Sequence, residues 1–375
     1  MSTKGRILAP AVWAVYLVIV LEFLFMISPL ALHFYASYGP VLNALHASPW
    51  TAWLTGFFLP HFSDTTSPLL NSLKLLGFLL ALAGLLTFVA GAGQVYGAKL
   101  LRRGAVTGGL YRLVRHPQYL GLAILGLGTT LIWPRFFVLL SYLLMLLLYS
   151  VLARWEETRC LKRYGDEYRA LQQRTGRFVP RQLTDWYPAL RGEGDPSIGA
   201  TLLRYGAIAV VVIGASFTFR EYSLSRITAS FDGRIAVLSP ALLSADELGE
   251  AFRIASEDNE TRKLLAGDRS GTPLLAFVVP SEWYMPDLPL HSVEEILRER
   301  GGHGTASEFD RTRYKVLLSR ARTHMHDPRG RDVVRWTYGH DPVTIVWVDL
   351  DAKEVLRHET PPRHVIWGDI PTPLF

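Results

Sequence analysis

The chain is organised around three nearby stretches: GLYRLVRHPQYLG (residues 109–121), EETRCLKRYGDEY (156–168) and GRFVP (176–180). Between the first two lies an apolar segment, 120–153, interrupted by Trp133-Pro134-Arg135. Proline disfavours helix both at its own position and at the residue before it, so the segment predicts two helices joined by a tight turn. Polar, charged and aromatic residues therefore crowd both ends of two apolar helices, where chemistry at a membrane surface would take place.

The composition indicates a protein that is half membrane and half water-soluble. Of 375 residues, 49% are hydrophobic, yet 19% are charged, which is too many for a chain lying wholly in a membrane. The single cysteine, Cys160, excludes an intramolecular disulfide framework. The net charge of +6 comes from Lys and Arg beside apolar segments, so membrane topology explains it and we expect no nucleic-acid partner.

Five apolar runs are candidates for membrane-spanning helices. The third is short, since at about 1.5 Å per residue it reaches only roughly 20 Å. We predict an α-helical integral membrane core over residues 1–200, a last transmembrane helix, and a soluble α+β domain over 222–375. The expected spans are 10–35, 75–96, 119–133, 136–153 and 201–221.

The distribution of basic residues predicts the orientation. No Lys or Arg occurs between Arg6 and Lys74, whereas the 97–117 loop and the 154–200 segment are basic. Basic loops stay on the cytoplasmic side. We therefore expect the N-terminus and both basic segments in the cytoplasm, and the last span then carries the tail outward.

The first loop, 36–68, should face outward. It contains Trp50 and Trp53, which favours an interfacial or partly re-entrant segment over a further span. The first apolar run is too long for a signal peptide and lacks a small-residue cleavage site, so it should be an anchor. We expect an integral protein of a bacterial inner membrane with a periplasmic tail.

The tail alternates strand and helix patterns after a turn-rich linker at 185–196. We expect strands at 234–238, 274–279, 343–350 and 354–358, the last two forming a hairpin, and helices at 245–265, 293–300 and 307–324. About 150 residues can bury a core of their own.

Histidines of the tail are possible metal ligands. They include His324, His326, His340, His358 and His364, with Asp327 beside the first two. Neither a helical His pair four residues apart nor a Cys/His framework accompanies them. Surface histidines are the favoured interpretation, and no metal is expected.

The segment Arg115-His116-Pro117 is a candidate binding site at the start of a helix. Proline favours the first turn of a helix, so Pro117 should begin the third span with His116 just before it. Free backbone amides at such a helix start, with Arg112 and Arg115 beside them, suit a carboxylate or phosphate. The plain alternative is that arginines at a cytoplasmic helix end only anchor the helix in the membrane.

Glu156 and Glu157 follow the fourth span directly. Successive residues on a helix point about 100° apart, so one carboxylate could face a pocket while the other meets solvent or an arginine. The plain alternative is weak pairing with Arg154, Arg159 or Arg163. Farther along, an apolar and aromatic stripe predicts an amphipathic helix against the membrane, which could form a lid; it comprises Leu161, Tyr164, Tyr168 and Leu171.

These elements, in this order, resemble the membrane methyltransferase superfamily of isoprenylcysteine carboxyl methyltransferases and phospholipid methyltransferases. The resemblance covers residues 96–182 and includes, in order, Gly109, Tyr111, Arg115-His116-Pro117, Tyr119, Gly121, Glu156-Glu157, Tyr164-Gly165, Tyr168, Arg177-Phe178 and Pro180. It implies an enzyme that binds S-adenosylmethionine at the cytosolic face and takes a membrane lipid or lipophilic small molecule as methyl acceptor.

The resemblance also implies roles for individual residues. It makes Tyr111, His116, Pro117, Tyr119, Glu156 and Glu157 cofactor-binding residues, with Arg115 and Glu157 in the catalytic role. Sterol reductases share an Arg-His-Pro-x-Tyr-x-Gly element, and Cys160-Leu-Lys-Arg-Tyr-Gly165 is similar to their later motif, so an NADPH-dependent reductase is an alternative. A non-catalytic scaffold that presents the tail is another. Neither the acceptor nor the oligomeric state follows from the sequence.

Overall fold

A computed structural model describes residues 3–36, 39–61, 64–101, 106–184, 197–266, 271–283, 285, 288–290 and 309–362. Two compact units are present. The first, here called the helical unit, consists of residues 1–36, 75–132 and 138–212. The second, the sheet unit, consists of residues 37–74, 133–137 and 213–375. The linker expected at 185–196 and the helix expected at 293–300 lie outside the described residues.

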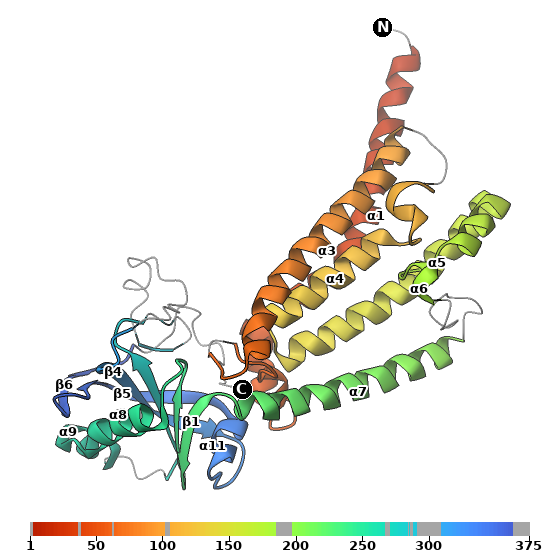
Figure 1. Cartoon of the computed structure of the whole chain (residues 1–375). Helices are drawn as coiled ribbons and strands as arrows, with labels where there is room; N and C mark the ends of the chain where they lie inside the picture. The colour runs from red at the N-terminus through yellow and green to blue at the C-terminus, as the bar shows by residue number, and fades with distance from the viewer. Residues whose placement is uncertain are drawn as a thin grey trace. The chain divides into compact units, whose positions relative to one another are not determined.

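Five apolar helices confirm the predicted membrane core, and the protein is an integral membrane protein (Figure 1). They are α1 (Thr3–Tyr35), α3 (Pro68–Leu100), α4 (Pro117–Ile132), α5 (Phe136–Arg174) and α7 (Ile198–Leu224). Four of them are long and apolar enough to cross a membrane, and α4 is the shorter fifth. Most helices continue well past the predicted spans, because apolar composition marks the part in lipid and not where the helix ends.

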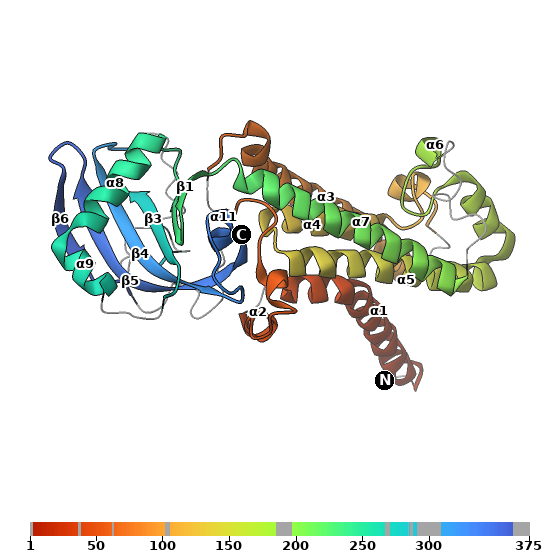
Figure 2. The same ribbon diagram turned by 90° about the horizontal axis from the view of Figure 1, so that it is seen from below.

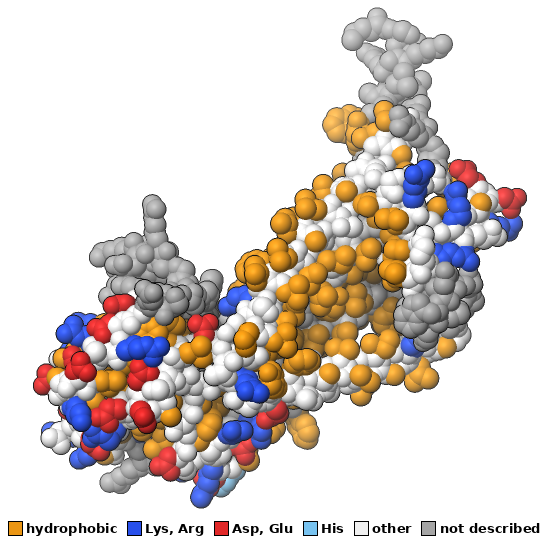
Figure 3. All heavy atoms as spheres, viewed as in Figure 1, with side chains coloured by type: hydrophobic (Ala, Val, Ile, Leu, Met, Phe, Trp, Pro, Cys, Tyr) orange, Lys and Arg blue, Asp and Glu red, His pale blue; other side chains and the backbone are white. Residues whose placement is uncertain are grey.

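Glycines let α3 and α4 pack with their backbones in contact, and Figures 1 and 2 both show the two helices side by side. A Cβ on Gly84 would lie 2.3 Å from the backbone nitrogen of Leu125, and one on Gly128 would lie 2.4 Å from that of Ala81. Such close approach is typical of helix pairs in membranes. The opposite side of α3 carries exposed apolar side chains, among them Leu75, Phe78, Leu82, Leu86 and Val89, as expected for lipid contact (Figure 3).

A kink in α5 reverses the chain after the fourth span. Gly165 has φ 52° and ψ −122°, a conformation that residues with a side chain rarely adopt. Residues 166–174 therefore form a separate helical segment, on which Tyr168 and Leu171 are buried. A second glycine allows a tight turn after this segment, because a Cβ on Gly176 would lie 1.8 Å from the Val179 carbonyl oxygen.

The first loop belongs to the sheet unit. Its described residues form α2 (Gly39–His46) and the 3₁₀ helix η1 (Ala52–Thr55), both too short to cross a bilayer. The loop contacts the tail directly: the Asp64 amide donates to the Pro240 carbonyl at 2.8 Å, and the His46 ring packs edge-on against Tyr338.

The tail contains a six-stranded mixed sheet in the order β1-β2-β3-β4-β5-β6, and the α+β prediction is confirmed. The strands are β1 (Thr228–Asp232), β2 (Ile235–Ser239), β3 (Leu274–Pro280), β4 (Arg313–Thr323), β5 (Thr337–Asp349) and β6 (Glu354–Glu359). Among the strands that the structure describes, β2 and β3 pair in parallel and the other neighbours are antiparallel. The predicted β5–β6 hairpin is present.

Helices cover the tail sheet and connect its parallel strands. The crossover between β2 and β3 contains α8 (Ala245–Glu257) and α9 (Asn259–Ala266), and Figure 2 shows both across one face of the sheet. Ser244 and Glu247 form a capping box at the start of α8. A short helix, α11 (Arg331–Trp336), precedes β5.

One tail element was predicted wrongly and another was missed. The helix expected at 307–324 is wrong, because the structure has β4 there. This strand lies between β3 and β5 with residues of both faces buried, including Tyr314, Lys315 and Val316. Burial on both faces removes the alternating pattern by which a strand is recognised. Strand β1, at the sheet edge, was not predicted.

Candidate functional site

Segments 114–116 and 176–177 lie side by side at the start of α4. The Arg115 amide donates to the Gly176 carbonyl at 2.9 Å, and the His116 amide donates to the Arg177 carbonyl at 3.1 Å. Helix α4 begins at Pro117, as predicted. The tight turn after Gly176 thus brings the third sequence stretch against the first.

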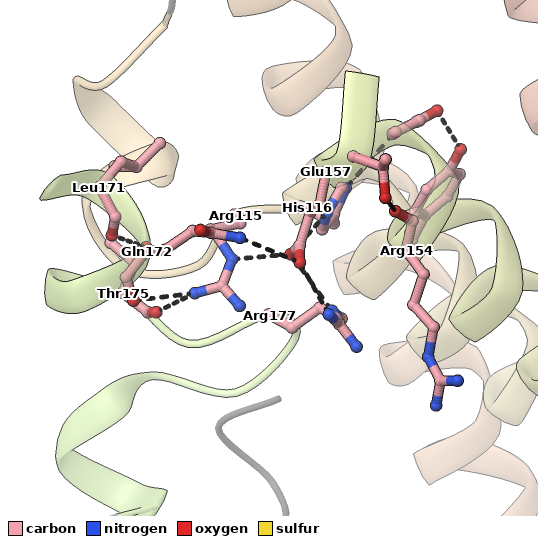
Figure 4. Close-up of polar contacts among 11 residues, drawn as sticks. Arg115, His116, Arg154, Glu157, Leu171, Gln172, Thr175 and Arg177 are labelled. Carbon is pink, nitrogen blue, oxygen red and sulfur yellow. Dashed lines mark hydrogen bonds and ion pairs between the residues drawn. The ribbon is translucent and has the colours of Figure 1, made fainter. Parts of the chain in front are cut away.

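Glu157 joins all three stretches in one buried ion cluster (Figure 4). Its carboxylate accepts hydrogen bonds from Arg115 Nε at 2.7 Å and from Arg177 Nη2 at 2.7 Å. The side chains of Glu157, Arg115 and Arg177 are only 5%, 3% and 7% exposed. A carboxylate held this way fixes the positions of the two arginines. Its removal would leave their buried positive charges uncompensated.

The kinked end of α5 completes this cluster. Arg115 Nη1 donates to the carbonyls of Gln172 and Thr175, and Gln172 Nε2 lies 3.4 Å from Glu157 Oε2. These groups reach Arg115 because the chain turns back at Gly165. Figure 4 shows the Arg154 side chain pointing away from Glu157. The weak pairing considered between the glutamates and Arg154 therefore does not describe Glu157.

Glu156 has different surroundings from its neighbour. The Tyr119 hydroxyl donates to Glu156 Oε1 at 2.5 Å, and His116 Nδ1 lies 3.4 Å from Glu156 Oε2. Its side chain is 42% exposed. The two carboxylates therefore differ as their angular separation on a helix predicts: Glu157 meets arginines, and Glu156 remains accessible.

His116 lies between the two carboxylates. Its Nε2 is 3.2 Å from Glu157 Oε1, while Nδ1 faces Glu156. Burial alone lowers the pKa of His116, but hydrogen bonds and charge attraction from the two glutamates outweigh burial, so that its pKa is raised above the ordinary 6.5. The charged imidazolium can donate from both nitrogens at once, which matches this position.

Aromatic rings pack around His116 and Tyr119. The His116 ring lies 5.6 Å from that of Tyr119 and 5.9 Å from that of Phe178, and Tyr119 stacks on Tyr149. Tyr111, in the 3₁₀ helix η2 (Gly109–Arg112), is buried and donates to Gln118 at 2.6 Å. The site thus has an accessible carboxylate supported by a stack of buried rings.

The structure brings together most residues that the sequence singled out. Arg115, His116, Tyr119, Glu156 and Glu157 form one connected network. Pro117 begins the adjoining helix, and Tyr111 donates a hydrogen bond to Gln118 in the first turn of that helix. Arg177 was absent from the predicted site list, although its GRFVP stretch was part of the resemblance. The sequence signal that could have identified Arg177 is its position directly after Gly176, in a turn that requires glycine.

The described histidines of the tail contact side chains instead of forming a metal-binding cluster. His358 Nε2 lies 3.0 Å from Asp258 Oδ2, and the His324 ring stacks on Tyr338. Within the described ranges, no group of three or more His, Cys, Asp or Glu side chains could hold a metal ion. His364 lies outside those ranges.

Comparison with known proteins supports a membrane methyltransferase. Residues 72–167 match the model of the family described as phospholipid methyltransferase. The match covers α3, α4 and most of α5, including both glutamates, and confirms the resemblance seen in the sequence. Neither curated proteins nor solved structures gave a match.

Proposed function

Because residues 72–167 match the phospholipid methyltransferase family, we propose that the protein transfers a methyl group from S-adenosylmethionine to a lipophilic acceptor. One observation carries the proposal: His116 and Tyr119 at the start of α4 share hydrogen bonds with Glu156 and Glu157, some forty positions away. Both halves of the sequence motif therefore contribute to a single site.

The residues present fit this cofactor. The accessible carboxylate of Glu156 can accept hydrogen bonds from ribose hydroxyls or from the amino group of the methionine part. Phe178 is only partly buried and provides flat apolar surface next to His116. When bound, S-adenosylmethionine would supply an electrophilic methyl group on its sulfonium. No metal ligand is needed for such a transfer.

Most of the catalytic contribution would come from positioning. A methyl acceptor attacks in line, so the chain must hold donor and acceptor close together and exclude water. Glu157 fixes Arg115, Arg177 and His116, and His116 with Tyr119 then fixes Glu156. In this scheme Glu156 contacts the cofactor, Glu157 is a positioning residue, and Arg115 orients the acidic end of cofactor or acceptor.

Topology is part of the same proposal. The N-terminus and the site lie on the cytoplasmic side of a bacterial inner membrane, where S-adenosylmethionine is made, and the tail lies in the periplasm. The basic residues around the site support this orientation, because basic segments remain inside.

The decisive experiment is titration calorimetry of the purified full-length protein with S-adenosylhomocysteine, the product form of the cofactor, and separately with NADPH. Binding of S-adenosylhomocysteine alone is expected. Binding of NADPH alone would instead indicate a reductase, and binding of neither would indicate a scaffold. Mass spectrometry of lipids and thiols from cells fed labelled methionine, with and without the protein, then identifies the acceptor.

A further inference from the structure

The first loop and the tail meet at a group of aromatic and histidine rings that the site above does not use. His46, at the end of α2, packs its ring edge-on against Tyr338 of β5, with the ring centroids 4.0 Å apart. The ring of His324, directly after β4, stacks on the same tyrosine at 4.2 Å, and its Nε2 donates to the His46 carbonyl at 3.3 Å. These three residues are here called the histidine contact, and all belong to the sheet unit.

The surroundings of His46 disfavour a positive charge on its ring. Its Nδ1 is buried and has no hydrogen-bond partner among the residues that the structure describes. A charge placed there would be buried without compensation. Burial, followed by the positive charges of His324 and Arg322, lowers the pKa of His46 from 6.5 to about 4. His46 is therefore neutral at pH 7 while α2 is in place.

The neighbouring charged groups of β4 and β5 do not offset a charge on His46. Arg322 pairs with Asp341 at 2.8 Å, so this carboxylate already has a cation. Burial, followed by the charge of Arg322, also lowers the pKa of His340 to about 4. The groups that face His46 from these strands, Tyr338, His324 and Arg322, are thus neutral or cationic.

The second half of the loop is attached to its surroundings without titratable groups. The Thr66 amide donates to the Arg226 carbonyl at 2.9 Å, and the Trp53 ring lies 5.5 Å from that of Phe136. Backbone hydrogen bonds and apolar ring contacts do not change charge as the medium becomes acidic. Loss of the histidine contact would therefore free α2 and leave the rest of the loop attached.

We propose that the histidine contact is pH-sensitive: it holds α2 against the tail near neutral pH and releases α2 on acidification. Protonation of histidines is a known way to open an interface. The released state binds more protons, because a ring in water titrates near pH 6.5. The contact is therefore complete above about pH 6.5, and release gains about tenfold for each pH unit below it. The inference does not depend on the methyltransferase reaction.

Hydrogen–deuterium exchange of the full-length protein in nanodiscs tests the proposal. Wild type and His46→Gln are compared at pH 7.5 and at pH 5.5, with a chelator present to keep metal ions off the histidines. Comparison at one pH cancels the effect of pH on the chemistry of exchange. The amides of α2 should exchange equally in both proteins at pH 7.5. At pH 5.5 they should exchange about tenfold faster in the wild type, because glutamine cannot take up the proton.

Two further variants serve as controls. Tyr338→Leu removes the ring on which both histidines pack, so α2 should exchange faster than in the wild type at both pH values. His326→Gln changes an exposed histidine two residues from His324 and should behave as the wild type does.

Three results would overturn the proposal. The first is equal exchange of α2 in wild type and His46→Gln at pH 5.5. The second is a gain in exchange of the same size in β2 of the wild type at pH 5.5, which would indicate general unfolding of the sheet unit. The third is an α2 that stays fully protected in Tyr338→Leu, since the ring contact would then not hold it.

Discussion

Two adjacent glutamates, Glu156 and Glu157, have different roles in the site. Glu157 is enclosed by Arg115, Arg177 and His116, whereas Glu156 is bonded by Tyr119 and His116 and remains accessible. Adjacent positions on a helix point about 100° apart, so one residue can organise the site while the next remains open to a ligand, even though both reach His116.

Substitution should separate these tasks. Glu157→Gln leaves two buried arginines without their carboxylate and should lower the free energy of unfolding by about 3–5 kcal/mol, with loss of cofactor affinity. Glu156→Gln is the matched change and should lose cofactor affinity at nearly unchanged stability. Thermal unfolding in detergent, combined with S-adenosylhomocysteine titration, measures both. Equal loss of stability in the two variants would contradict the division.

His116 should make stability depend on pH. Its pKa is raised in the folded protein above the ordinary 6.5. Its contribution to stability is therefore complete below about pH 6.5 and is lost as the pH rises through the folded-state pKa. The unfolding temperature of the wild type should fall over that range more than the unfolding temperature of His116→Gln. Parallel pH profiles of the two proteins would argue against a charged His116.

Glycines determine how closely the helices approach one another. Gly77, Gly84, Gly121 and Gly128 allow backbone contact between α3 and α4, and Gly165 lets the end of α5 fold back onto Arg115. The site depends on both features, since one places the start of α4 and the other places Gln172 and Thr175.

A pair of alanine substitutions on α3 tests the helix contact. Gly84→Ala would place a Cβ 2.3 Å from the backbone of Leu125, and the forced separation should cost about 1–3 kcal/mol of stability. On the same helix, a Cβ at Gly93 would meet no other element of the described chain within 4 Å, so Gly93→Ala should be neutral or slightly stabilising. Unfolding in detergent compares them. Similar effects of the two changes would show that the contact is not tight.

The tail and the first loop belong to the same compact unit, the sheet unit. Backbone hydrogen bonds join Asp64 to Pro240 and Thr66 to Arg226, and Arg335 pairs with Glu221 at the end of α7. The tail is thus attached to the loop between the first two membrane helices and not only to α7. The two backbone hydrogen bonds require the loop and the tail to lie on the same side of the membrane.

Topology can be tested with reporters at both places. A reporter active only in the cytoplasm should be inactive when fused after Phe375 or inserted near Trp50 in the first loop, and active when fused to the N-terminus. The physical reason is the basic composition of the 97–117 loop, which remains inside. Activity after Phe375 would reverse the proposed orientation of the tail.

The amino-acid sequence was enough to predict the membrane core, the start of α4 at Pro117 and the different surroundings of Glu156 and Glu157, because apolar length, proline geometry and helical spacing are local properties. It did not reveal β4, whose burial on both faces follows from its place between β3 and β5. Nor did it reveal the ion pair of Glu22 and Lys99 or the bonds of Arg177 to Glu157. These pairings are seen only in the folded chain, since contacts between distant charged groups depend on how helices pack and where the chain turns back.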